Sequence, residues 1–182
     1  MSKRLVILSD LWGPRKGLWI TSYLGYLQQY FDITYYDTSQ LADLDVSHPT
    51  VSSLTAAFSE GGMERAVRNL ISKETQPAHY LAFCAGGSVV WKAIKKGLPA
   101  KSLYAISPMD LHKESKINGC PVKVLYGEYM DNKPSKNWAV QNGVTLEVFP
   151  RFGHGMYSDE VVIQKVCQEL LEESLRKQYQ GL

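Results

Sequence analysis

Short apolar runs of strand length alternate with stretches of helical period along the chain. A strand that is buried on both faces of a parallel sheet has a nearly continuous apolar sequence. A helix packed on such a sheet instead shows apolar residues three and four positions apart. The alternation therefore predicts an α/β fold, in which helices cover both faces of a parallel sheet. Six strands are expected, at residues 5–9, 33–36, 79–83, 102–106, 122–126 and 145–149.

Four other segments have the period of amphipathic helices and should cover this sheet. Between the second and third strands, residues 37–62 form a polar connection that is longer than most loops in compact domains. We expect this connection to wall a pocket or to form a short helix. The four expected helices lie at 20–31, 63–71 and 85–97, and in a last segment that begins at Ser158 or Asp159.

Composition limits the classes of protein to consider. With 182 residues, 45% hydrophobic and 21% charged, the chain is expected to form a single domain over residues 1–182. The formal charge of +2 is spread without runs of one sign, so no nucleic-acid partner is expected. The first apolar run is too short for a signal peptide or a membrane span. The cysteine and histidine spacings fit neither disulfides nor metal sites, which predicts a cytoplasmic location with no metal and no cofactor.

The most informative stretch joins the strand at 79–83 to the following helix through Cys84. Small residues around this position leave room for a sharp turn that strains and exposes one side chain. Unpaired N–H groups at a helix start favour a thiolate, so Cys84 is expected to be unusually acidic and to act as a nucleophile. The N–H of Ala85 would face the oxyanion that develops during attack. Alternatively, Cys84 is only a small buried apolar residue.

Residues 83–87, Phe-Cys-Ala-Gly-Gly, resemble the G-x-C-x-G-G elbow of the dienelactone hydrolase family. This family is a branch of the α/β-hydrolases in which cysteine replaces the commoner serine, and Ala82 stands where it has its first glycine. The resemblance implies the α/β-hydrolase fold, with about six parallel strands in the order 2-1-3-4-5-6. It also implies a histidine after the last strand and an acid after the strand at 122–126.

His154 lies between two glycines after the last strand, where the resemblance implies the general base. It could instead be an ordinary loop residue. Residues 127–131, Gly-Glu-Tyr-Met-Asp, resemble the G-x-x-D segment that carries the acid, with one residue inserted. Asp131 is the expected acid and Glu128 the alternative, although a solvated turn acid would look the same. The order Cys84, Asp131, His154 matches the nucleophile, acid, histidine order of α/β-hydrolases.

Residues 9–13, Ser-Asp-Leu-Trp-Gly, resemble the family's glutamate-x-aromatic-glycine segment after the first strand. By that match, the N–H of Leu11 is the second oxyanion donor. Asp10 takes the place of the acid that, in the family, contacts the resting cysteine and keeps it unreactive until substrate binds. Asp10 could equally form an Asx turn or cap the next helix. Trp12 could contact the substrate or belong to the core.

These features predict a hydrolase that cleaves a small ester, lactone or thioester through an acyl-enzyme on Cys84. His154 would be the base, and Asp131 would orient its imidazole. The short stretch between the strands at 102–106 and 122–126 leaves little material for a lid, which favours a small substrate. A thioesterase or acyltransferase would use the same residues. A non-catalytic α/β-hydrolase fold that serves as a binding or interaction module is a further alternative, favoured by the inserted residue before Asp131.

Overall fold

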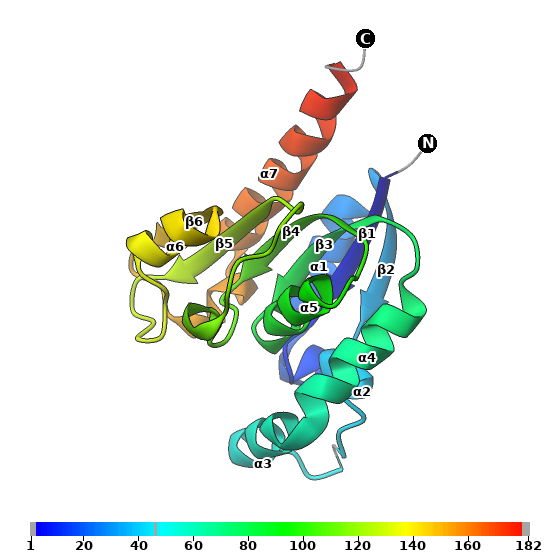
Figure 1. Ribbon diagram of the computed structural model, residues 1–182, viewed down its shortest axis with the longest axis vertical. Coiled ribbons are helices and arrows are strands. Elements are labelled where there is room, and N and C mark those ends of the chain that lie inside the picture. Colours follow the sequence, from blue (N-terminus) through cyan, green and yellow to red (C-terminus); the bar gives the residue numbers. More distant parts are fainter. Residues whose placement is uncertain (1–2, 46, 180–182) are drawn as a thin grey trace.

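The computed structural model describes residues 3–45 and 47–179. A sheet of six parallel strands lies between two layers of helices (Figure 1). The strand order is β2-β1-β3-β4-β5-β6, which confirms the predicted fold class and topology. The strands are β1 (Lys3–Leu8), β2 (Phe31–Tyr36), β3 (Ala78–Phe83), β4 (Ala100–Ile106), β5 (Val122–Gly127) and β6 (Val144–Phe149).

The longer helices divide between the two faces of the sheet (Figure 1). Helices α1 (Trp19–Leu27) and α7 (Glu160–Tyr179) pack together on one face. Helices α4 (Met63–Lys73), α5 (Ala85–Lys95) and α6 (Lys136–Asn142) cover the other. None of the described helices is long and apolar enough to span a bilayer. The shorter segments are η1 (Gly13–Lys16), α2 (Thr38–Leu41), α3 (Val51–Ala57), the π turn η2 (Phe58–Gly62), η3 (Leu111–Lys113) and η4 (His154–Ser158).

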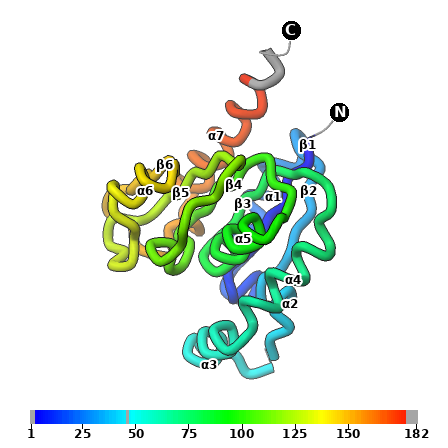
Figure 2. The backbone as a smooth tube through the Cα atoms, viewed as in Figure 1, coloured from blue at the N-terminus to red at the C-terminus, as the bar shows by residue number. Residues whose placement is uncertain are grey.

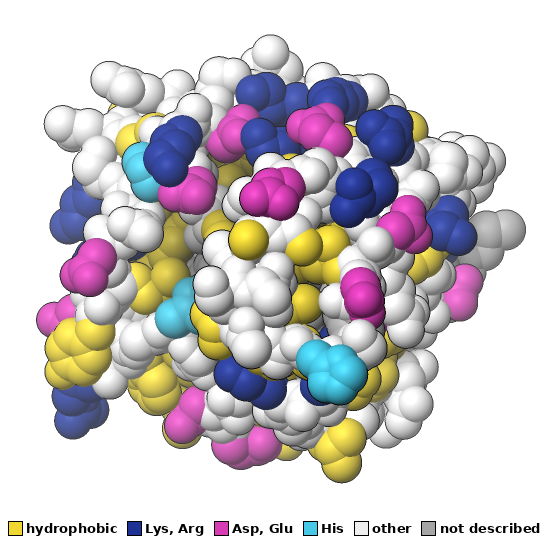
Figure 3. Space-filling view, turned by 90° about the horizontal axis from the view of Figure 1, so that it is seen from below, with side chains coloured by type: hydrophobic (Ala, Val, Ile, Leu, Met, Phe, Trp, Pro, Cys, Tyr) yellow, Lys and Arg dark blue, Asp and Glu magenta, His cyan; other side chains and the backbone are white. Residues whose placement is uncertain are grey.

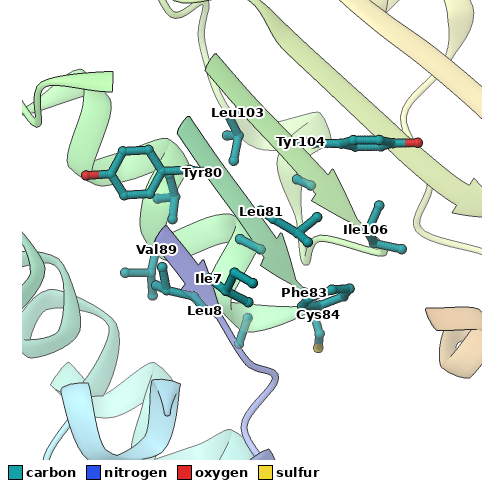
Figure 4. Packing of buried hydrophobic residues seen from close by; sticks show 14 of the residues in the cluster. Ile7, Leu8, Tyr80, Leu81, Phe83, Cys84, Val89, Leu103, Tyr104 and Ile106 are labelled. Atoms are coloured by element: carbon teal, nitrogen blue, oxygen red, sulfur yellow. The ribbon is translucent and has the colours of Figure 1, made fainter. Parts of the chain in front are cut away.

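Central strands that are buried on both faces explain the apolar runs in the sequence. Every residue of β1 from Leu5 to Leu8 is fully buried, as are Tyr80 to Phe83 of β3. Figure 4 shows side chains of β1, β3 and β4 packed along these strands, with Cys84 at the end of β3 and its sulfur pointing away from them. The core therefore holds β3 rigidly and presents Cys84 at the carboxyl edge of the sheet.

One local prediction needs correction, and one helix was missed. Helix α1 ends at Leu27, so Phe31 does not lie on its face but begins β2, where it pairs with Lys3 of β1. A Tyr30 N–H bond to Leu27 O closes the helix, and Phe31 is then buried at the start of the strand. Helix α6 was not predicted, because its seven residues span only two turns and show little apolar period.

The polar connection at 37–62 forms the helices α2 and α3 and the turn η2, as the sequence analysis anticipated. Asp37 caps α2 by accepting from Ser39 N at 2.9 Å, and Thr50 caps α3. Gly61, with φ 107°, bends the chain between α3 and α4. Figure 2 shows α3 projecting from the end of the molecule opposite the chain termini.

Candidate active site

Cys84 occupies a sharp turn between β3 and α5, as predicted. Its φ of 49° and ψ of −121° lie outside the regions that L residues normally adopt, and such strain costs about 1–3 kcal/mol. The turn also needs two glycines, because the chain passes very close to its neighbours. A Cβ at Gly86 would lie 2.4 Å from the carbonyl oxygen of Ser9, and one at Gly87 would lie 2.9 Å from Cβ of Pro108. The small residues that indicated the turn are therefore required by close packing.

His154 reaches Cys84 from the loop that follows β6. Its Nε2 atom lies 3.2 Å from the Cys84 sulfur, within hydrogen-bonding distance for a thiol. Among the described residues, the His154 ring makes no other hydrogen bond. Cys84 itself is only 8% exposed, so the expectation of an exposed side chain is wrong; the residue lines a cavity instead. The structure thus brings together the nucleophile and base that the sequence suggested.

Electrostatics at this pair differ from the prediction. Burial raises the pKa of the Cys84 thiol to about 12, and the charge of Asp10 adds to the rise, while the N–H of Ala85 acts in the opposite direction. Partial burial lowers the pKa of His154, although Asp10 opposes that effect. The expected acidic thiol is therefore wrong, because desolvation outweighs the helix start. At neutral pH the pair rests as a thiol and a neutral imidazole.

The two predicted oxyanion donors lie beside the same cavity. Ala85 is the first residue of α5, so its N–H has no acceptor within the helix, and it is close enough to the Cys84 sulfur to affect its pKa. Leu11 is buried in the loop after β1 and lines the cavity. Among the residues the structure describes, none accepts a hydrogen bond from the N–H of Leu11. The N–H of Ala85 faces the Cys84 sulfur, whereas that of Leu11 has no acceptor among the described residues, and the oxyanion role of both stays a prediction.

Asp10 is a buried carboxylate whose hydrogen bonds are all accounted for. Its Oδ1 accepts from Trp12 N at 3.0 Å and from Gly13 N at 2.8 Å, as in the Asx turn considered above. Its Oδ2 accepts from the Tyr157 hydroxyl at 2.8 Å. These bonds leave the carboxylate directed at partners other than the Cys84 sulfur. Its effect on the thiol is therefore one of charge.

The turn after β5 holds the loop that carries His154. Tyr129 N donates to Phe152 O at 2.9 Å, and the Glu128 carboxylate accepts from Arg151 N at 2.8 Å. Gly127 permits this approach, because a Cβ there would lie 2.4 Å from Phe152 O. Glu128 thus contacts the backbone of the loop rather than the His154 ring.

Asp131, the predicted acid, lies on the exposed side of the same turn. It does not line the cavity, whereas its neighbours Met130 and Asn132 do. Of the carboxylates in the described residues, neither that of Asp131 nor that of Glu128 is hydrogen-bonded to His154. The assignment of the acid therefore stays a prediction.

The cavity has a volume of about 530 Å³ and a largely apolar wall. Figure 3 looks onto the end of the molecule where it opens and shows hydrophobic side chains within a hollow. Trp12 lines it, with Nζ of Lys16 3.9 Å from the centre of a Trp12 ring, and its contact with a substrate stays a prediction. Helix α3 contributes Val51 and Thr55, so the long polar connection does wall the pocket.

Sequence reasoning missed Tyr157 and several wall residues. Tyr157 follows His154 by three positions in η4, and an aromatic residue so close to a suspected base was a usable signal. Met109 and Met130 come from separate loops, and their sequences carry no comparable signal. Within residues 3–45 and 47–179, no group of His, Cys, Asp and Glu side chains is arranged to hold a metal ion.

No protein-family model matches this chain, and no curated protein matches its sequence. Solved structures do match. A protein from Klebsiella pneumoniae provisionally assigned as a dienelactone hydrolase is 14% identical, with a TM-score of 0.69 over 96% of this chain and 88% of that chain. Est1E from Butyrivibrio proteoclasticus is 13% identical, with a TM-score of 0.64 over 94% and 88%. Naproxen esterase from Bacillus subtilis is 11% identical, with a TM-score of 0.59 over 94% and 83%. These likenesses confirm the expected α/β-hydrolase fold.

Proposed function

We propose that this chain is a hydrolase that cleaves a small ester, lactone or thioester through an acyl-enzyme on Cys84. The observation that carries the proposal is the 3.2 Å separation of the Cys84 sulfur and His154 Nε2 at a strained turn that lines a cavity. A cysteine that merely fills the core requires neither backbone strain nor a histidine partner. Hydrolases and esterases among the structural neighbours support the same reaction class.

Acylation begins when the Cys84 sulfur attacks the substrate carbonyl carbon. A thiol with a pKa of about 12 is a poor nucleophile at neutral pH, so its proton must pass to His154 Nε2 as the bond forms. The N–H groups of Ala85 and Leu11 bind the oxyanion of the tetrahedral intermediate. His154 then gives the proton to the leaving alcohol or thiol as its bond to carbon breaks, which leaves a thioester on Cys84.

Deacylation uses the same groups in reverse roles. His154 Nε2 takes a proton from water while the water oxygen adds to the thioester carbonyl. The tetrahedral intermediate collapses, the carbon–sulfur bond breaks, and the proton returns to the Cys84 sulfur as the acid product leaves. Trp12 and the apolar wall contact the substrate, and the modest cavity volume favours a small one. Asp131 acts as the orienting acid only if its turn moves toward His154, and Glu128 is the alternative.

Hydrolysis of p-nitrophenyl acetate and butyrate, with intact-protein mass measured after mixing, tests the proposal. Wild-type protein should turn over and show an acyl adduct. Cys84→Ala should lose both, and Cys120→Ala is the matched control because Cys120 lies outside the cavity. His154→Ala should lose turnover, whereas the exposed His112→Ala should not. Thioester substrates and an added acceptor alcohol in the same assay separate a thioesterase or acyltransferase from an esterase.

A binding module is the second candidate, favoured by the lack of a carboxylate bound to His154 in the described residues. An adduct confined to Cys84 with multiple turnovers would exclude it. The binding module would be favoured if the protein shows no adduct and no turnover, and if a substrate-sized ester raises its melting temperature.

A further inference from the structure

Tyr157 links His154 to the buried Asp10. Its hydroxyl donates to Asp10 Oδ2 at 2.8 Å, and its ring meets the His154 ring edge-on, with 6.0 Å between centroids and 81° between planes. Tyr157 is itself firmly held, because its ring packs against Trp19 at 4.7 Å and its carbonyl accepts from Tyr23 OH at 3.0 Å. A carboxylate on the loop after β1 is thus connected to the base on the loop after β6.

We propose that Asp10 and Tyr157 position His154, so that the acid supporting the base comes from the loop after β1 rather than from the turn after β5. This inference rests on the proposed hydrolase function. Tyr157 anchors η4, the turn that begins with His154, and so fixes the ring toward Cys84. The Asp10 charge stabilises the imidazolium that forms when His154 takes the thiol proton. Asp10 and Tyr157 are positioning residues, since both act through His154.

The geometry limits which other charged groups could stabilise the protonated His154. Cys84 and Tyr157 flank the His154 ring, and Asp10 is the carboxylate whose charge raises its pKa. Two further charged residues line the cavity but are engaged elsewhere: Lys16 lies over Trp12, and Asp110 pairs with Lys113 at 3.0 Å. Asp10 also differs from Asp131 in being almost fully buried, so its charge is less screened.

Two conservative variants test the proposal. Asp10→Asn keeps an oxygen for Trp12 N and Gly13 N but removes the charge, and Tyr157→Phe keeps the ring but removes the hydroxyl. Each should lower kcat/KM by about 10- to 100-fold, the range for a lost hydrogen bond to a charged group. In Asp10→Asn the acid limb of the pH profile should move to lower pH, because His154 loses a neighbouring negative charge. Tyr157→Phe should keep the limb in place. Asp32→Asn, an exposed charge on β2, is the control.

In Asp10→Asn, lower activity with an unmoved acid limb would show a purely structural role for Asp10, and that result would overturn the proposal. So would Asp131→Asn producing the shift while Asp10→Asn does not. Nuclear magnetic resonance titration of the His154 imidazole gives a readout that needs no turnover. If wild-type protein hydrolyses nothing, the proposed function fails, but a lower His154 pKa in Asp10→Asn would still support the positioning role. An unchanged pKa would refute it. If Asp10→Asn does not fold, a Tyr157→Phe protein with wild-type kcat/KM would refute the proposal instead.

Discussion

Replacing Gly86 with alanine should destabilise the protein, although alanine is the better helix former. The added methyl would lie 2.4 Å from Ser9 O and 2.9 Å from Leu8 Cβ, both in or beside β1. Ordinary contact begins near 3.4 Å, so α5 would have to move from β1 by about 1 Å, the difference between 3.4 and 2.4 Å. Overpacking of this kind lowers the free energy of unfolding by about 1–3 kcal/mol. The cost at Gly86 should lie near 3 kcal/mol, because the opposing atoms belong to or adjoin the buried strand β1. The higher helix propensity of alanine offsets about 1 kcal/mol of this cost, so the free energy of unfolding should fall by about 2 kcal/mol.

Gly25→Ala is the matched control, since Gly25 lies in α1 with nothing within 4 Å of an added Cβ. It should stabilise the protein by about 0.5–1 kcal/mol. The two variants should therefore differ by about 3 kcal/mol, or about 6–12 °C in melting temperature for a chain of this length. Thermal and urea unfolding followed by circular dichroism measure both. A Gly86→Ala protein that melts as high as Gly25→Ala would refute the claim that close approach at the elbow requires glycine.

Three further outcomes follow from charges and burial. Glu74→Ala should lower the free energy of unfolding in urea by about 2–3 kcal/mol, because this buried carboxylate accepts hydrogen bonds from Arg4 and Tyr36 at 2.8 Å. Glu64→Ala, at an exposed ion pair, should lower it by at most about 1 kcal/mol. Lysine hydrogen bonds keep the pKa of Glu169 below its ordinary value despite desolvation. Its stabilising effect is therefore present above the unfolded-state pKa and disappears as pH falls through the lower folded-state pKa, so the stability gap between wild type and Glu169→Gln should narrow from pH 7 to pH 3. Iodoacetamide at pH 8 should label Cys84 in the folded protein at least about tenfold more slowly than in urea, because burial raises the pKa of the thiol to about 12. Peptide mass measures both labelling rates, and equal rates would contradict this reasoning.

The sequence predicted those features whose causes are local. Residues 5–8 are apolar because both faces of β1 are covered, so the strand and its place in a parallel sheet were evident. The turn at Cys84 was evident for a similar reason, since Gly86 and Gly87 must remain small where α5 crosses the ends of neighbouring strands. Helix α6 buries only Ala139 of its seven residues and therefore left no such pattern.

The properties of the candidate site depend on residues that are distant in sequence. The thiol pKa was predicted in the wrong direction, because a helix start is visible in the sequence whereas burial of the sulfur and the position of Asp10 are not. Likewise, the Tyr157–Asp10 bond joins residues 147 positions apart. Each residue alone is compatible with an ordinary turn or core role.

The acid illustrates the limit most clearly, because the turn that resembles the acid-bearing segment also holds the loop that carries His154. The backbone of the segment that follows β5 is already used to hold the His154 loop, through Tyr129 N and the Glu128 carboxylate. Those bonds fix the loop, and Asp131, at the far end of the turn, is left in solvent. A nearby negative charge would stabilise the protonated form of such a base. The carboxylate that we propose for this part, Asp10, follows β1, so a motif match at the β5 turn could not reveal it.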